Sequence, residues 1–243
     1  MNTKDLKFRS RELLNGHHSR FGSIVLSYLV LLFLCQYVPS MIFTDITKPF
    51  SFVSAILLSY LMTVISDLLV IGLMRIALSI CRGQYYAFSD LFHAFRNQSD
   101  QFVKMQLILT GISTLPGIPL LFLNVISDHF ALTIYEYYGL LFLFSILAGV
   151  LTLVITLRLK MAAFVIMDDP DLGAIEALKL SWNLTRGHYF KLLGLYISFI
   201  GMYLLSIISL MIGYILVYPY VQTSLALYYE DLKTNYANAI GVH

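Results

Sequence analysis

Long apolar runs separated by short polar segments extend along all 243 residues of this chain. A helix needs about 20 apolar residues to cross the roughly 30 Å hydrocarbon core of a bilayer. The runs predict crossings over Gly22–Ile42, Phe52–Ile80, Phe102–Leu123 and Tyr137–Leu157, and two more that share Phe190–Tyr229 and divide near Ser206–Gly213. The predicted fold class is therefore all-α, a polytopic membrane protein with six transmembrane helices arranged as three hairpins.

The basic residues predict how these helices are oriented. Of the 16 Lys and Arg residues, all except Lys48 fall in segments that the six crossings place on one side of the membrane. Basic residues near helix ends stay on the cytoplasmic side, so we expect both termini in the cytoplasm and a multi-pass protein of the cell membrane. A basic inner face would attract anionic lipids. The charges are too dispersed to predict a nucleic-acid partner.

Composition narrows the organisation of the chain further. Hydrophobic residues make up 58% of the sequence and charged residues only 12%, whereas soluble domains carry about 25% charged residues. The polar segments leave no room for a separate soluble domain, so residues 1–243 are expected to form a single integral-membrane domain. The two cysteines, Cys35 and Cys81, show no metal-binding spacing, and no motif predicts a metal or another cofactor.

A polar segment with helical periodicity precedes each predicted hairpin. The clearest contains Leu172, Ile175, Leu178 and Trp182, which recur on one helical face and precede Gly187, a residue suited to a left-handed C-cap. Similar patterns run from Thr3 to Gly16 and from Phe88 to Asn97. They predict amphipathic helices in the inner interface and three units, 1–82, 83–160 and 161–243. Alternatively, the cytoplasmic loops of a hydrophobic protein acquire such helices without any repeat.

Asp67 is the candidate intramembrane functional residue. It lies eight residues before Arg75, which is about 12 Å along a helix. If Arg75 marks the inner interface, Asp67 lies near the middle of the membrane, where an acidic group usually marks a path for an ion, a proton or a substrate. The alternative is a hydrogen-bonded Asp that packs helices together through Ser59, Ser66 or a partner in another helix.

Prolines and interfacial side chains supply the remaining candidates. Pro116, Gly117 and Pro119 should kink or break the third crossing, and Pro219 should do the same near the inner end of the sixth. Each kink is a candidate gate or, alternatively, a packing device. Four further residues are expected at the inner interface, where aromatic rings and long cationic side chains are favoured: Trp182, Arg75, Arg158 and Lys160.

Three segments carry a resemblance to a known family. They are Leu6–Gly16, Ala177–Leu192 and the closing stretch Pro219–Leu232, the most specific of the three. Together they resemble an uncharacterised bacterial integral-membrane family found widely in Firmicutes. The chain is more distantly similar to the membrane domain attached to some bacterial glycerophosphodiester phosphodiesterases. The resemblance implies a six-helix membrane fold and a Gram-positive host, and it implies no established activity.

The sequence leaves two functional hypotheses of different kinds. No GxSxG, HExxH or phosphate-binding loop is present, so we do not expect an enzyme. The first hypothesis is a non-enzymatic scaffold or modulator that acts on a membrane-protein partner at the inner leaflet. The second is a transporter or lipid-handling protein whose path lies near Asp67 and the broken third crossing. An intramembrane enzyme would need a second ionisable group beside Asp67.

Overall fold

The computed structural model describes residues 2–42, 49–119, 133–209 and 212–240. All regular elements in these ranges are helices, as predicted. They are α1 (Thr3–Leu14), α2 (His18–Ile42), α3 (Pro49–Cys81), η1 (Phe88–Phe92), α4 (His93–Arg96), α5 (Ser99–Thr114), η2 (Leu115–Gly117), α7 (Ile134–Leu159), α8 (Ala162–Asp168), α9 (Ala174–Thr185), α10 (Tyr189–Ile208) and α11 (Ile212–Ile240).

Four helical segments of the described ranges are long and apolar enough to cross a membrane: His18–Val38, Val53–Cys81, Ile134–Asp168 and Tyr189–Ile208. By contrast, α5 has 16 residues before the chain tightens into the 3₁₀ turn η2, which is shorter than a crossing requires. The C-terminal part of α11 is polar and charged. Six crossings with both termini in the cytoplasm therefore stay a prediction.

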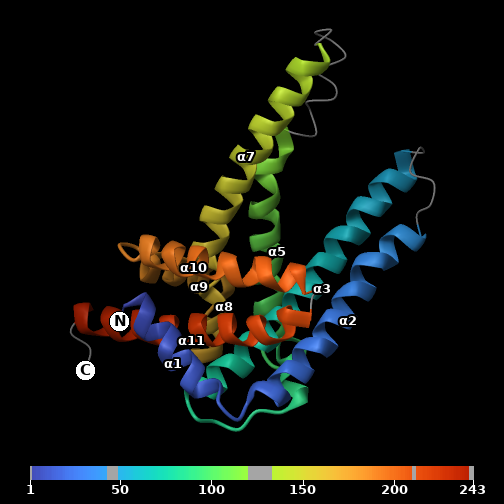
Figure 1. Ribbon diagram of the computed structural model, residues 1–243. Coiled ribbons are helices and arrows are strands. Elements are labelled where there is room, and N and C mark those ends of the chain that lie inside the picture. Colours follow the sequence, from blue (N-terminus) through green and yellow to red (C-terminus); the bar gives the residue numbers. More distant parts are fainter. Residues whose placement is uncertain (1, 43–48, 120–132, 210–211, 241–243) are drawn as a thin grey trace.

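The helices are arranged as two diverging pairs and a third pair that lies across them. In Figure 1, α2 and α3 run together toward one side, while α5 and α7 run together toward the other. The helices α10 and α11 contact each other and lie across the region where the two pairs converge. The three pairs correspond to the three predicted hairpins, but the third is not parallel to the other two.

Burial follows this arrangement. The core occupies the convergent ends of the pairs and contains Phe21, Met74, Phe102, Phe164 and Leu225 among its fully or almost fully buried side chains. The divergent ends expose large apolar side chains, including Leu34, Met41, Leu57, Phe142 and Leu143. Apolar surface on this scale is typical of helices that contact lipid.

The N-terminal helix α1 packs against the protein itself. Its buried face consists of Leu6, Ser10 and Leu14, and it contacts α11. The Ser224 hydroxyl donates to Ser10 Oγ at 2.9 Å, and the Tyr220 hydroxyl donates to the carbonyl of Lys7 at 3.2 Å. The apolar face predicted to lie in the inner leaflet is therefore covered by protein.

The helix α9 buries a different face from α1, one made mainly of small side chains. Small side chains dominate its buried face (Ala174, Ala177 and Ser181), whereas Ile175 and Trp182 are exposed. Small residues let neighbouring helices approach closely, and here they pack against α5, α7 and α8. The small residues of the buried face were not part of the predicted stripe, and the interfacial position of α9 stays a prediction.

Local backbone signals were mostly predicted correctly. Gly16 and Gly187 adopt left-handed conformations with φ of 86° and 82°, as expected for residues that end helices. Asn97 is extended instead, and the neighbouring Gln98 takes the left-handed conformation with φ of 50°. The short helix α8 was not predicted, because its buried run Ala162–Ile166 is uniformly apolar and has no period.

Candidate functional site

Asp67 joins two helices in the buried half of the molecule. Gln106 of α5 donates from Nε2 to Asp67 Oδ2 at 2.7 Å. The same Gln106 nitrogen lies 3.4 Å from Thr110 Oγ1, and both Gln106 and Thr110 are buried. Ser66 takes no part, since its hydroxyl donates to the carbonyl of Met62. Asp67 is thus hydrogen-bonded to another helix, as the alternative interpretation of this residue expected. Its partner, Gln106 of α5, is one that the sequence did not indicate.

A second ionisable group lies at the same pocket. Asp67, Gln106, Thr110 and Lys160 all line a pocket of about 190 Å³, and Tyr218 of α11 lines it too. Lys160 directly follows α7 and is half-buried. Its ammonium group makes no hydrogen bond or ion pair with any part of the chain that the structure describes, although its charge acts on Asp67. Here the structure brings together two candidates that the sequence placed apart.

A larger groove adjoins this pocket. It has a volume of about 760 Å³ and lies between α5, α7 and α10, with Gly117, Ala148, Gly149, Leu153 and Tyr196 among its lining residues. The groove and the pocket share three lining residues, Ser113, Thr156 and Lys160. Lys160 therefore lies where the apolar groove meets the pocket that contains Asp67 and Gln106.

The break in the third predicted crossing forms one end of the groove. Pro116 lies in the 3₁₀ turn η2, and Gly117 ends that turn and lines the groove. Thr152 of α7 donates to the carbonyl of Ser113 at 3.3 Å, which fixes α7 against the last turn of α5. Pro119 is exposed at the end of the described range. The rest of the third crossing and the outer loop after it lie outside the described residues.

Tyr196 contributes an unsatisfied polar atom to this region. Its ring lines the groove, and its buried hydroxyl has no hydrogen-bond partner among the described residues. Buried polar groups are normally paired with protein or with an ordered molecule. The Tyr196 hydroxyl is therefore a buried polar group without a partner among the described residues, next to the groove.

The predicted interfacial residues pack helix ends together. The Arg158 guanidinium lies 4.3 Å from the ring centroid of Trp182 and 5.2 Å from that of Tyr189, so a cation–π contact joins α7, α9 and α10. Arg75 is half-buried on α3. Burial, and secondarily the positive charge of Arg75, lowers the pKa of His93 below its usual value.

Pro219 does not interrupt its helix. The helix α11 continues through Pro219 from Ile212 to Ile240, and Thr223 donates to the Pro219 carbonyl at 2.9 Å. Pro219 lines neither the groove nor the pocket described above. A gate at this residue therefore stays a prediction.

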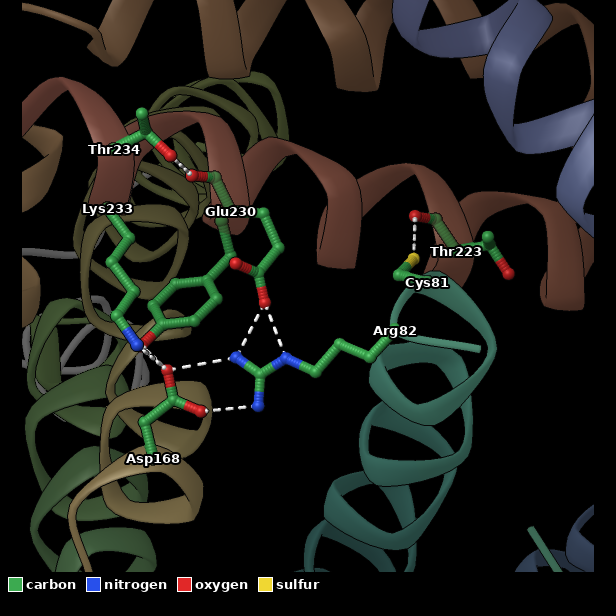
Figure 2. Close-up of polar contacts among 8 residues, drawn as sticks. Cys81, Arg82, Asp168, Thr223, Glu230, Lys233 and Thr234 are labelled. Atoms are coloured by element: carbon green, nitrogen blue, oxygen red, sulfur yellow. Dashed lines mark hydrogen bonds and ion pairs between the residues drawn. The ribbon is translucent and has the colours of Figure 1, made fainter. Parts of the chain in front are cut away.

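An ion-pair network at the convergent end joins three helices and was not predicted. Figure 2 shows Arg82, at the end of α3, between Glu230 of α11 and Asp168 of α8. Arg82 Nε donates to Glu230 Oε1 at 2.7 Å, and its Nη1 lies 2.7 Å from Asp168 Oδ1. Lys233 and the Tyr229 hydroxyl also bond to Asp168. The hydrogen bond to Asp168 is the main reason why the pKa of Arg82 rises above its usual value.

The groove, the charged groups and the apolar helices described above indicate a class of protein and not yet a function. Within the described residues, no group of three or more His, Cys, Asp or Glu side chains could hold a metal ion. What is present is an apolar groove, one cation and one carboxylate among helices whose length and composition point to a membrane protein.

The chain belongs to the family described as "Protein of unknown function (DUF975)", whose model matches residues 1–236. The resemblance to an uncharacterised family is thereby confirmed, while the Firmicutes host and the distant likeness to a phosphodiesterase membrane domain stay predictions. No curated protein matches the chain. No solved structure matches it either.

Proposed function

We propose that this protein is a non-enzymatic, multi-pass protein of the cell membrane that binds a membrane lipid, with the acyl part of the lipid in the groove between α5, α7 and α10. The observation that carries the proposal is the apolar groove that ends at Lys160. Its volume of about 760 Å³ lies within the range of ligand-binding sites, roughly 300–1,000 Å³.

The form of the groove favours a lipid over a small polar solute. Its middle is lined by Ala148, Gly149 and Leu153 of α7, and Lys160 lies where the groove meets the pocket. Small residues on α7 leave room for a chain without moving the backbone. Adjacent side chains of α7, such as Ile146 and Val150, are exposed, so a lipid could enter from the bilayer.

The same geometry favours lipid handling over a scaffold that acts through surface helices. The scaffold hypothesis rested on three apolar helix faces at the inner leaflet, and the apolar face of α1 instead packs against the protein. The lipid hypothesis required a cavity beside Asp67, and Asp67 lines one with Lys160. A membrane-protein partner remains compatible with lipid binding.

Filling the groove should prevent lipid binding. A Cβ atom at Gly149 would meet no other atom within 4 Å, so Gly149→Phe should fold normally while its ring occupies the groove. We expect lipid affinity to fall at least about tenfold, equivalent to about 1.4 kcal/mol. Native mass spectrometry of the detergent-purified protein, titrated with phospholipid, measures the bound fraction.

Gly139→Phe is the matched control, because Gly139 lies on the same helix, is equally open, and lines no cavity described here. It should bind lipid like the unmodified protein. Thr152→Phe, at a second groove position, should repeat the loss. Unchanged lipid affinity in both groove variants would refute the proposed function.

A further inference from the structure

The pocket beside the groove holds two opposite charges that do not satisfy each other directly. Asp67 and Lys160 both line the pocket of about 190 Å³, yet no ion pair of 4 Å or less joins them in the described structure, where the ion pairs that form involve other residues. Intramembrane charges are costly unless they are paired. A bound group with complementary charges would pair both.

The hydrogen bond that Asp67 already accepts determines which kind of ligand group it can still bind. One carboxylate oxygen, Oδ2, accepts from Gln106. The other oxygen, Oδ1, receives no hydrogen bond from the residues that the structure describes. An ionised carboxylate is an acceptor only, so the group that binds there must be a donor, and a cationic donor would form the strongest bond.

Lys160, in contrast, requires a ligand group that accepts hydrogen bonds. Its ammonium group carries three donors and no acceptor, and it lies where the pocket meets the groove. A phosphate at this junction would accept from Lys160. The part of the ligand nearest the acyl chains should therefore be anionic, and the part that extends toward Asp67 should be cationic.

We propose that the pocket recognises the headgroup of a zwitterionic phospholipid with a primary ammonium group: its phosphate pairs with Lys160 and its ammonium donates to Asp67. This inference rests on the proposed function, since the acyl chains occupy the groove. Phosphatidylethanolamine has this headgroup. Phosphatidylcholine lacks N–H donors on its quaternary ammonium, and phosphatidylglycerol has hydroxyl groups but no cation to pair with Asp67.

The test compares these three lipids with matched acyl chains by native mass spectrometry. The unmodified protein should bind phosphatidylethanolamine at least tenfold more tightly than either other lipid. Asp67→Asn should reduce this preference to about twofold or less. Asparagine can still accept from Gln106, so the thermal unfolding midpoint of the variant should stay unchanged and exclude a folding defect. Asp171→Asn, an exposed acid before α9, should leave the preference intact.

Lys160→Gln should weaken binding of all three lipids by a similar factor, because all carry the phosphate, whereas Lys160→Arg should largely retain it. Lys179→Gln removes an exposed cation from α9 and should have no effect. If the phosphatidylethanolamine preference survives in Asp67→Asn, the headgroup assignment is wrong.

The outcomes separate this inference from the proposed function. If Gly149→Phe abolishes binding while Asp67→Asn leaves the lipid preference unchanged, the groove binds lipid and only the headgroup assignment fails. If Gly149→Phe and Thr152→Phe both bind lipid normally, the proposed groove site itself is wrong. Free phosphoethanolamine that displaces the lipid at equal concentration would show that the pocket takes a soluble headgroup and would overturn the lipid assignment.

Discussion

Gly72→Ala is expected to destabilise the fold by about 3 kcal/mol, because no side-chain carbon fits at this position. A Cβ atom built on Gly72 would lie 2.0 Å from the carbonyl oxygen of Leu91 and 2.5 Å from its carbonyl carbon. Both atoms belong to the backbone of η1, which packs against α3, and Leu91 is fully buried. Relief of the overlap requires a backbone shift rather than a rotamer change.

Two opposing effects set the size of the change. Overpacking of a closely packed core costs about 1–3 kcal/mol and occasionally more, and a backbone clash lies at the upper end. Alanine recovers up to about 1 kcal/mol of helix propensity relative to glycine. The clash should dominate, and the thermal unfolding midpoint in detergent should fall by about 5–10 °C.

Gly139→Ala provides the matched control for this prediction. A Cβ atom at Gly139 would meet nothing within 4 Å, so the substitution should leave the midpoint unchanged or raise it slightly. If Gly72→Ala unfolds at the same temperature as Gly139→Ala, η1 does not contact α3 as described here.

Arg82→Met is expected to destabilise the protein by about 2 kcal/mol. The substitution removes the cation that joins Asp168 of α8 to Glu230 of α11. Breaking a fully buried ion pair costs about 3–5 kcal/mol. The smaller figure applies because the Arg82 side chain is 26% exposed and that of Glu230 is 34% exposed, so solvent screens part of the loss. Lys233 and Tyr229 also continue to bond to Asp168.

A double-mutant cycle isolates this interaction from side-chain packing. In the Glu230→Met background, Arg82→Met should cost about 1 kcal/mol less than in the unmodified protein. Lys104→Met serves as a control, since Lys104 forms an exposed pair with Asp100 within one helix and should change stability by less than about 0.5 kcal/mol. Equal midpoints for the Arg82 and Lys104 variants would mean that the network does not fasten the three helices.

Features that depend on nearby residues were predictable from the sequence. The apolar runs located α2, α3, α7 and α10 to within a few residues, because length and hydropathy are properties of a contiguous segment. The left-handed Gly16 and Gly187 were predicted because only their local backbone mattered. Asp67 stood out because an acid within an apolar run is conspicuous without knowledge of its neighbours.

Features that depend on distant residues were not predictable. Gln106 and Lys160 line the same pocket as Asp67 only because α5 and α8, the helix that follows Lys160, pack against α3. The network of Arg82, Asp168 and Glu230 spans 148 positions of sequence, and no local pattern distinguishes these charges from solvated ones. The tilt of α10 and α11 across the other helices likewise reflects packing rather than hydropathy.

Photo-crosslinking tests most directly whether a lipid chain occupies the groove between α5, α7 and α10, as we propose. Purified protein would be incubated with a trace of phospholipid that carries a diazirine on its acyl chain, irradiated, and mapped by peptide mass spectrometry with and without excess unlabelled lipid. We expect competable adducts on Ala148, Thr152, Leu153 and Tyr196, which line the groove. Adducts spread evenly over the exposed ends of α2 and α3, with none in the groove suppressed by competitor, would contradict the account.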